Sequence, residues 1–270
     1  MAIPNIIVRI QNRCRRGLSI YLGRRMVHLK SKYPIISFTF DDFPRSALHQ
    51  GGAILCRHGV RGTYYTSLGL MGHEMPAGAG FLAGDLQQTV AEGHELGCHT
   101  FAHCHAWKTK PSNFEESIIK NRQVLAELLP EVAFKTLSYP IDCPHPQIKR
   151  RAAKYFACCR GGGRSLSAGF GDGNKSRNPA FNVGPTDINN LQTYFLEKSR
   201  DNPQAIKDLI DENCRVQGWL IFATHDVCFA PSPYGCTPDF FEDIVSYAVN
   251  SGSRILPVGK AWDLINVNWT

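Results

Sequence analysis

Two adjacent carboxylates, Asp41 and Asp42, stand directly after the segment Ile35–Phe40. This segment is rich in apolar, aromatic and β-branched residues, and Pro44 follows soon after it, which is the pattern of a buried strand that leaves its sheet. In α/β folds ligands bind at the carboxyl ends of strands, so both acids are expected where a ligand would bind. Neighbouring carboxylates repel each other, and at least one of them needs a nearby cation or a proton. The pair therefore predicts a nearby cation, and a metal ion first of all.

Segments with strand and helix patterns alternate along most of the chain. We expect strands at residues 35–40, 62–67, 134–139, 156–159, 218–225 and 255–258, and helices at residues 46–58, 86–92, 113–129, 148–155, 201–217 and 239–251. Such alternation is typical of a mostly parallel sheet, either open or closed into a barrel. The region 161–180, rich in Gly, Ser and Asn, is expected to be a loop on the side of the active site.

The residues before the first expected strand are strongly basic and include no acidic residue. They hold eight basic side chains: Arg9, Arg13, Arg15, Arg16, Arg24, Arg25, Lys30 and Lys32. The net charge of the whole chain is +7, so the remainder is close to neutral. We therefore expect no nucleic-acid partner.

Apolar residues in this basic arm recur at roughly helical spacing, with arginines between them. They are Ile3, Ile6, Ile7, Ile10, Cys14, Leu18, Tyr21 and Leu22. A basic amphipathic helix can lie on an anionic membrane surface, and it can equally pack across the core of the protein. The apolar run at residues 6–8 ends at Arg9, which is too short for a signal peptide or a membrane span. We expect a cytoplasmic protein, with the arm in peripheral contact with the inner face of the membrane.

Two histidines, His99 and His103, are four residues apart. On a helical turn, residues with this spacing share a face, so both imidazoles can reach one ion. Two histidines, one carboxylate and an open water position form the ligand set of hydrolytic zinc sites. The alternatives are solvated or core histidines, or a structural zinc cluster that uses Cys98, Cys104 and His105. That cluster is the weaker alternative because no second pair of cysteines stands at a familiar spacing.

A third histidine, His225, closes the apolar segment 218–224 and precedes Asp226. If that strand is buried, the histidine points into the mouth of a cleft, where it can act as a general acid near neutral pH. The alternative is a surface histidine beside Asp226. The remaining histidines outside these motifs are expected to be structural or solvated.

In this order, the pieces resemble the NodB-type polysaccharide deacetylases, carbohydrate esterase family 4. The resemblance spans residues 35–258 and is carried by Thr39-Phe40-Asp41-Asp42, His99-Thr100-Phe101-Ala102-His103, Tyr139-Pro140 and Ala223-Thr224-His225. It implies an α/β fold, an irregular (β/α) barrel, here with an N-terminal basic amphipathic helical extension. We accordingly expect that extension at residues 1–33 and a polysaccharide deacetylase-like catalytic domain at residues 34–270.

The resemblance also implies roles for the motif residues. Asp41 inherits the role of the general base, and His225 that of the general acid. The metal ligands are then Asp42, His99 and His103. The ion is expected to be Zn²⁺, with Co²⁺ or another divalent ion as alternatives.

The third motif differs from that of many family members. Residues 138–142 read Ser-Tyr-Pro-Ile-Asp, with Tyr139 and Pro140 as the matched pair, where many relatives have Arg-Pro-Pro-Tyr-Gly. The main-chain N–H of Ile141 is expected to bind the oxyanion. The arginine that orients the base in those relatives is absent, and Arg160 is the candidate for a substitute cation.

Two further departures concern the fourth motif and the residue after the Asp pair. The aromatic-and-acid motif that supports the catalytic histidine is not recognisable, and Asp187 is the candidate for its acid. Phe43 stands where relatives usually have glycine, and we expect it to narrow the cleft.

Together these patterns predict a metal-dependent hydrolase that uses a metal-activated water. Its expected substrate is an N-acetylated glycan or a lipid-linked polysaccharide intermediate of the bacterial exopolysaccharide type, from which it removes N-acetyl groups. One alternative keeps the same site but acts as a deacylase or deformylase of a small amide. The other is a catalytically degenerate glycan-binding family member, which the missing arginine motivates.

Overall fold

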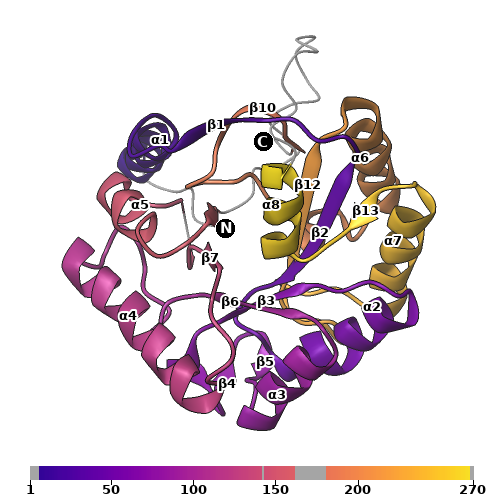
Figure 1. The fold of residues 1–270 in the computed structure, drawn as a ribbon, viewed down its shortest axis with the longest axis horizontal. Helices are drawn as coiled ribbons and strands as arrows, with labels where there is room; N and C mark the ends of the chain where they lie inside the picture. The colour runs from indigo at the N-terminus through magenta and orange to yellow at the C-terminus, as the bar shows by residue number, and fades with distance from the viewer. Residues whose placement is uncertain (1–5, 142, 162–180, 268–270) are drawn as a thin grey trace.

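The computed structural model describes residues 6–141, 143–161 and 181–267, so the loop expected at residues 161–180 lies almost wholly outside the described part (Figure 1). The α-helices are α1 (Ile6–Tyr21), α2 (Ala53–Arg57), α3 (Ala83–Ala91), α4 (Pro111–Leu128), α5 (Pro146–Ala152), α6 (Pro203–Val216), α7 (Pro238–Asn250) and α8 (Val258–Val267). The strands are β1 (Met26–Leu29), β2 (Ile35–Phe40), β3 (Thr63–Thr66), β4 (Glu74–Met75), β5 (Gly78–Ala79), β6 (Glu95–Cys98), β7 (Thr136–Ser138), β8 (Cys158–Arg160), β9 (Phe181–Asn182), β10 (Gly184–Asp187), β11 (Tyr194–Phe195), β12 (Trp219–Thr224) and β13 (Arg254–Ile255).

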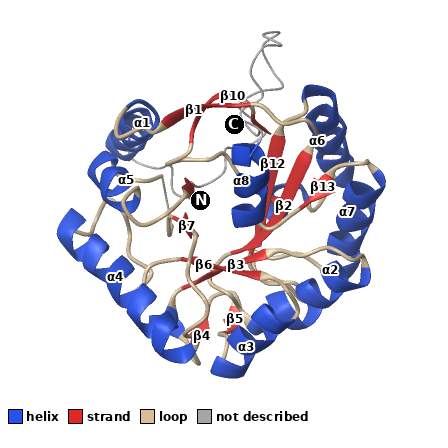
Figure 2. Cartoon of the chain, viewed as in Figure 1, coloured by secondary structure: helices blue, strands red, loops and turns tan. Residues whose placement is uncertain are grey.

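The main sheet is parallel and has the strand order β11-β12-β2-β3-β6-β7-β8. β13 pairs with the beginning of β2, and β9 pairs antiparallel with β12. Beyond β8, Cys159 and Leu191 are joined by a backbone hydrogen bond of 2.9 Å, which brings the far edge round toward β11. Most helices lie outside this curled sheet (Figure 2). The expected α/β fold of the irregular (β/α) barrel type is confirmed.

Two adjacent strands at the centre, β2 and β12, end next to each other. Every residue of both strands is buried, which is why each reads as a nearly continuous apolar segment. Their register pairs Phe40 with Thr224, and the rings of Phe38 and Phe222 stack with centroids 5.6 Å apart. Asp41 and the residue after Thr224 therefore leave the sheet at the same edge, as expected for parallel neighbours.

Some local boundaries differ from the sequence pattern. The helix expected at residues 86–92 begins earlier, at Ala83, because the Asp85 carboxylate accepts a 2.8 Å hydrogen bond from the backbone N–H of Leu82. Residues 47–52 form a π-helical turn before α2, within the segment expected to be one helix. α8 was not expected; its first residue, Val258, donates a backbone hydrogen bond to Thr63 Oγ1.

The basic N-terminal segment is joined to the rest of the fold. β1 pairs antiparallel with β10, and the buried amine of Lys149 donates to the carbonyl oxygens of Ser19 and Leu22 at the end of α1. The last carbonyls of a helix have no partner within the helix, so this amine satisfies groups that would otherwise lack one. The expected helix in the extension is therefore present, and its end is fixed against α5. The domain boundary at residue 33 stays a prediction.

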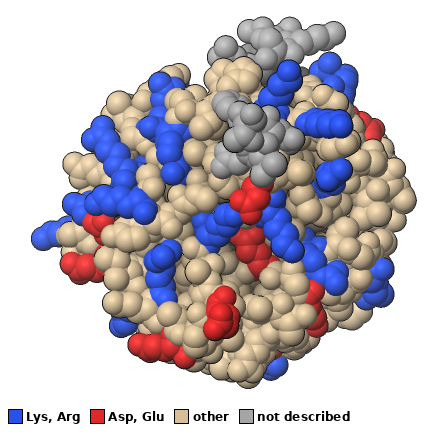
Figure 3. All heavy atoms as spheres, viewed as in Figure 1, with Lys and Arg blue, Asp and Glu red and all other residues tan. Residues whose placement is uncertain are grey.

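The outer face of α1 is apolar and exposed. Ile10 is 58% exposed and Tyr21 69% exposed, with Leu18 between them. Lys and Arg side chains gather over α1 and α5 on the face seen in Figure 3. In the part of the chain that the structure describes, none of the helices combines the length and apolar character needed to cross a bilayer.

Candidate active site

A large cleft opens where the strands of the main sheet end. Its volume is about 1410 Å³, which exceeds the usual range for a site that binds one small molecule. The five residues that the motifs predict as catalytic or metal-binding all line it: Asp41, Asp42, His99, His103 and His225. Residues from distant parts of the sequence thus meet at one edge of the sheet.

Asp42, His99 and His103 form a compact group of ligand atoms. Asp42 Oδ1 lies 3.0 Å from His103 Nε2 and 3.4 Å from His99 Nε2, and the two imidazole centroids are 5.0 Å apart. Burial alone would raise the pKa of Asp42, but the two histidines outweigh it and hold the pKa well below the ordinary value of a carboxyl. The group has the two nitrogen ligands and one oxygen ligand of a zinc-type site with open positions.

The hydrogen bonds around this group favour a cation within it. His99 Nδ1 lies 2.8 Å from the Ser138 carbonyl oxygen, which can only accept, so Nδ1 carries a proton; in the neutral ring the lone pair of Nε2 then faces Asp42. Asp42 Oδ1 is buried and accepts no well-formed hydrogen bond from the described residues. A lone pair and a carboxylate oxygen that face each other repel unless a proton or a metal ion lies between them. The residues present therefore fit a divalent ion, with Ser138 orienting one ligand from behind.

The loops that carry these ligands contain left-handed backbone at residues other than glycine. Asp42 has φ 62°, Thr100 has φ 60° and His103 has φ 49°. Such conformations cost roughly 1–3 kcal/mol each and concentrate at functional sites. The expectation that His99 and His103 share a helical turn is wrong, because Thr100 and His103 turn the chain into a tight loop after β6. The two imidazoles converge through this loop instead.

Arg160, at the end of β8, donates from Nη2 to Asp41 Oδ1. Both side chains are buried, and the guanidinium carbon lies 4.6 Å from the centroid of the Tyr65 ring. Burial alone would raise the pKa of Asp41, but Arg160 outweighs it and holds the pKa below the usual range. Asp41 is therefore ionised at neutral pH and fixed in orientation. Arg160 is in the position expected of a substitute cation.

His225 follows β12 and has its two ring nitrogens in different surroundings. Nδ1 lies 3.3 Å from the Tyr234 carbonyl oxygen and must donate to it, while Nε2 lies 4.0 Å from Asp42 Oδ2. The ring is stacked near Phe195, with centroids 6.2 Å apart. Asp226 does not pair with His225, since its carboxylate accepts from the backbone N–H and the hydroxyl of Ser232. Nε2 is thus placed to exchange a proton with a group bound in the cleft.

The expectation that Asp187 supports His225 is wrong. Its carboxylate accepts from Lys149 Nζ at 2.6 Å and from the backbone N–H of Arg25 at 2.9 Å. The reason is electrostatic: the buried lysine needs a counter-ion, and Asp187 provides it. The backbone carbonyl of Tyr234 orients His225 in place of an acid.

The third-motif residues lie at the rim of the cleft. Tyr139 and Ile141 line it, on either side of the buried Pro140. Ile141 is 62% exposed and has φ 72°, another left-handed residue at the site. Its assignment as the oxyanion donor stays a prediction. The hydroxyl of Tyr139 is buried without a hydrogen-bond partner among the described residues, and burial raises the pKa of this phenol.

The expectation that Phe43 narrows the cleft is wrong. Its ring is fully buried, with centroids 4.8 Å from Tyr64 and 5.0 Å from Phe81. The positive φ of 53° at Phe43 turns the side chain into the core. An aromatic residue at this position therefore contributes to packing.

A second group of ligand types, Cys56, Glu92 and His94, lies elsewhere in the fold. The backbone N–H of Gly62 donates to His94 Nδ1 at 3.0 Å, so the proton of the neutral ring is on Nε2, which faces Cys56 Sγ at 3.4 Å. An imidazole nitrogen that carries a proton cannot bind a metal ion. This group is therefore a hydrogen-bonded cluster, and burial lowers the pKa of His94 to about 4. Neither group of possible metal ligands found among the described residues contains Cys104 or His105, the alternative zinc ligands.

Sequence patterns did not identify several residues that line the cleft. Arg13 and Arg16 come from α1, whereas Phe195, Glu197 and Lys198 come from β11 and the 3₁₀ turn that follows it. Burial raises the pKa of Glu197 to about 7. The spacing of the arginines indicated a helix with two different faces, but nothing in the sequence indicates which side of the helix faces the cleft.

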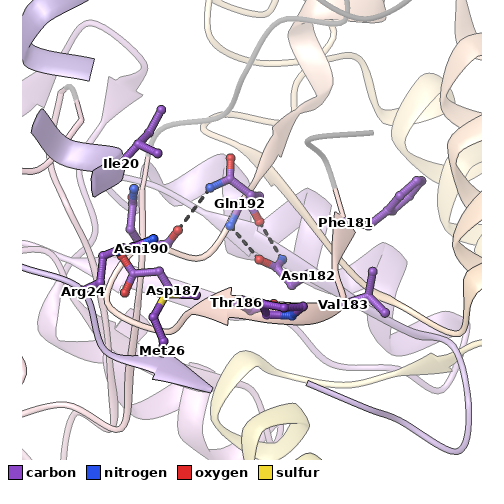
Figure 4. A pocket seen from close by; sticks show the side chains of 11 residues that line it. Ile20, Arg24, Met26, Phe181, Asn182, Val183, Thr186, Asp187, Asn190 and Gln192 are labelled. Atoms are coloured by element: carbon purple, nitrogen blue, oxygen red, sulfur yellow. Dashed lines mark hydrogen bonds between the residues drawn. The ribbon is translucent and has the colours of Figure 1, made fainter. Parts of the chain in front are cut away.

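A smaller pocket of about 190 Å³ adjoins the cleft and shares Ile20, Asn190 and Gln192 with it. Figure 4 shows hydrogen bonds between the amide side chains of this pocket and the backbone of neighbouring residues. Asn182 Nδ2 donates to the Gln192 carbonyl oxygen at 3.0 Å, and Gln192 Nε2 donates to the carbonyl oxygen of Asn190 at 3.2 Å. The backbone N–H of Gln192 also donates to Asn182 Oδ1 at 2.8 Å, so the Asn182 side chain joins β9 to the backbone of the segment before β11.

Comparison with known proteins gives a family and a fold. Residues 29–155 match the family model described as polysaccharide deacetylase. None of the curated proteins compared with the chain matches it significantly.

Three solved structures show the same fold over most of the chain. The chitin deacetylase of Colletotrichum lindemuthianum is 14% identical, with a TM-score of 0.58 over 88% of this chain and 91% of that chain. An acetyl xylan esterase of family 4 from Clostridium thermocellum, in complex with a cobalt ion, is 17% identical, with a TM-score of 0.54 over 85% of this chain and 91% of that chain. A mutant of a family 4 pseudoenzyme is 10% identical, with a TM-score of 0.58 over 88% of this chain and 71% of that chain.

Because these structures include both enzymes and a pseudoenzyme, the shared fold alone does not decide activity. The match to the family model is a likeness in sequence as well as in fold, and it covers the segment from before Asp41 to beyond the third motif. With the shared barrel, this match confirms the resemblance to the NodB-type polysaccharide deacetylases, and the matched segment, residues 29–155, is just under half of the chain.

Proposed function

We propose that this protein is a metal-dependent deacetylase that removes N-acetyl groups from a glycan. One observation supports this most: the ligand group of Asp42, His99 and His103 lies in the same cleft as Asp41 and His225. An acid–base pair beside a cation site is what amide hydrolysis requires. The family, the fold and the cleft volume support a carbohydrate polymer as substrate.

The metal would be held by Asp42, His99 and His103. When bound, a divalent ion polarises a carbonyl group and lowers the pKa of water, which is the chemistry an unreactive amide needs. The ligand set suits Zn²⁺, and Co²⁺ is a second candidate because a cobalt ion is present in one of the similar structures.

The residues of the chain then move the protons. Asp41, held ionised by Arg160, accepts a proton from the attacking water. His225 donates from Nε2 to the departing sugar nitrogen while the Tyr234 carbonyl oxygen holds Nδ1. The main-chain N–H of Ile141 is the proposed donor to the oxyanion. The products are acetate and a glycan with a free amine.

Arg160 is a positioning residue in this scheme, and its replacement gives a testable shift in pH dependence. Because Arg160 lowers the pKa of Asp41, Arg160→Met raises that pKa, and activity on the acidic side is lost at a higher pH than in wild type. We expect kcat/KM at neutral pH to fall by about tenfold to a hundredfold, as when other residues that orient a catalytic group are lost. Arg160→Lys, which keeps the charge, should recover part of the activity and of the acidic limb. Steady-state acetate release across pH measures both, and an unshifted acidic limb in Arg160→Met would contradict the assignment.

The substrate is proposed to be an exopolysaccharide precursor, in free or lipid-linked form, met on the cytoplasmic side of the membrane. The exposed apolar residues Ile10, Leu18 and Tyr21 of α1 support peripheral contact with an anionic membrane, since basic residues flank them.

The experiment that tests the proposed function is acetate release from N-acetylglucosamine oligomers by the metal-loaded protein, compared with small acetamides and formamides. We expect oligomers to be hydrolysed faster than small amides, because the cleft is larger than one small molecule needs. Preference for small amides would favour the deacylase alternative. Metal binding with no release from any compound would favour the degenerate glycan-binding alternative.

A further inference from the structure

We propose that α1 forms a cationic wall of the cleft, and that this wall binds a phosphate group carried by the glycan. The inference rests on the proposed function and specifies its substrate. The wall consists of Arg13 and Arg16, which line the same cleft as the catalytic residues. Its position differs from that of a membrane-binding surface, because these two guanidinium groups face the cleft.

The position of α1 is set by buried contacts. Lys149 Nζ donates to the carbonyl oxygens of Ser19 and Leu22 at 2.7 Å and 3.0 Å, and Asp187 neutralises this amine. Asn189 Nδ2 donates to the carbonyl oxygen of Gly23 just beyond the helix. The helix therefore presents its side chains to the cleft from a fixed base, as a specific binding surface requires.

Helical geometry divides α1 into two faces. Arg13, Arg16 and Ile20 recur at intervals of three and four residues and all line the cleft. Ile10 and Leu18, eight residues apart, lie toward the other side and are 58% and 44% exposed. Arg13 and Arg16 are both exposed to solvent, and they lie on the side of the helix that borders the cleft, whereas the exposed apolar residues Ile10 and Leu18 do not line it. The cleft-lining position of the two arginines indicates a function in binding.

The two arginines have no counter-ion of their own among the described residues. Across residues 6–141, 143–161 and 181–267, neither guanidinium forms a hydrogen bond or an ion pair. Lys198 adds a third positive charge nearby; burial lowers the pKa of its amine, Glu197 opposes this shift, and the charge of Arg16 lowers the pKa further. The charge of Arg13 and Arg16, which is not neutralised by the described residues, attracts an anion into a concave site. The cleft also contains acidic residues, Asp41, Asp42, Glu74 and Glu197, and of these burial raises the pKa of Glu197 to about 7, so its opposing charge is reduced.

The wall also lies near the acid of the proposed reaction. Lys198 Nζ is 5.2 Å from the centroid of Phe195, and the Phe195 ring stacks near His225. The positive charges therefore extend from α1 toward the side of the cleft where the sugar nitrogen would depart. An anionic group next to the deacetylated sugar would reach them.

Phosphate is the anion that this arrangement suits best. Arginine binds phosphate oxygens through paired N–H donors, and each such charged hydrogen bond is stronger than a neutral one. The phosphate could belong to a lipid-linked glycan or to a soluble glycosyl phosphate, and the chemistry that the wall recognises is the same in both. The exposed apolar face of α1 places the lipid-linked source first.

The test compares three forms of one N-acetylglucosamine tetramer: neutral, with a 1-phosphate at the reducing end, and lipid-linked through a diphosphate in detergent micelles. We expect wild type to prefer both phosphorylated forms through a lower KM, and added salt to reduce this preference. In Arg13→Gln/Arg16→Gln the ratio of kcat/KM values, phosphorylated to neutral, should fall by about tenfold to a hundredfold. Arg16→Lys should retain part of the preference.

Arg150→Gln is the matched control, because Arg150 is an exposed arginine of α5 that does not line the cleft, and it should leave the ratio unchanged. Equal kcat/KM for neutral and phosphorylated tetramers in wild type would overturn the proposal. A preference confined to the lipid-linked form would overturn it as well, since lipid rather than phosphate would then be recognised. Binding of the 1-phosphate to Asp41→Asn, measured by calorimetry, does not depend on turnover. The absence of phosphate binding can therefore be distinguished from the absence of the proposed hydrolysis. Thermal unfolding of each variant shows that it is folded.

Discussion

Asp41→Asn is expected to release acetate from N-acetylglucosamine oligomers about a thousandfold more slowly than wild type, with its metal content unchanged. Asparagine has the shape of aspartate but cannot accept a proton from water at neutral pH. Asp41 is not one of the three grouped ligand residues, so the ion should stay in place. Acetate assays and metal analysis on the same sample measure both effects.

The variant also leaves Arg160 without its counter-ion, which must be separated from the loss of the base. Both side chains are buried, and removing one partner of a buried pair destabilises a protein by roughly 3–5 kcal/mol. The double variant Asp41→Asn/Arg160→Met removes the unpaired charge, and it should be folded and equally inactive. Thermal unfolding shows whether the single variant is folded at the assay temperature.

Asp85→Asn is the matched control for this change. Asp85 is also a buried acid that accepts from an arginine, Arg45, but it caps α3 and does not line the cleft. Its variant should lose some stability and keep its turnover number. Equal turnover by Asp41→Asn and wild type would show that another residue is the base.

Strands buried on both faces were the most predictable part of this fold. β2 and β12 each read as a continuous apolar segment because every one of their residues is buried, and the polar residues after them mark where the strands end. The sequence pattern therefore suffices to place Asp41, Asp42 and His225 at one edge. Short elements such as β1 and β10 were not expected, because their pairing with each other fixes them and local pattern does not.

The convergence of side chains from distant segments was only partly predictable. Arg160 reaches Asp41 across 119 positions of the sequence, and only its type and strand-end position suggested the contact. Asp187 was only a candidate for the acid that supports His225, and in the structure its carboxylate neutralises the buried Lys149. Which cation a buried acid meets depends on burial and side-chain direction, and one sequence does not contain that information.

Loop geometry and helix orientation were the other limits. His99 and His103 were expected on a helical turn, but left-handed residues at the loop bring them together. The spacing of α1 predicted its two faces and could not show which one faces the protein. Tertiary packing decided both, which is why local pattern identified the residues without their arrangement.

Removal of one metal ligand should show which of the two groups of possible ligands, the one with His103 or the one with Cys56, binds the ion. We expect the affinity of His103→Ala for Zn²⁺ to be lower than that of wild type by more than about a hundredfold. This loss is larger than the loss of affinity caused by removing a residue that only orients a ligand. His103 is the suitable ligand to change because its side chain is 25% exposed, whereas His99 is buried and its loss would leave a cavity. Metal content after dialysis and acetate release measure the effect.

Zinc should also raise the unfolding temperature of wild type after chelation, because an ion that binds only the folded state stabilises it by about 2.7 kcal/mol at a hundredfold excess over Kd. It should not do so for His103→Ala. His105→Ala, in the same loop, and Cys56→Ser, in the hydrogen-bonded cluster with His94, should both respond as wild type does. If Cys56→Ser loses the response and His103→Ala keeps it, the proton assigned to His94 Nε2 is wrong. The ion would then bind away from Asp41 and His225, and neither could act on a water beside it.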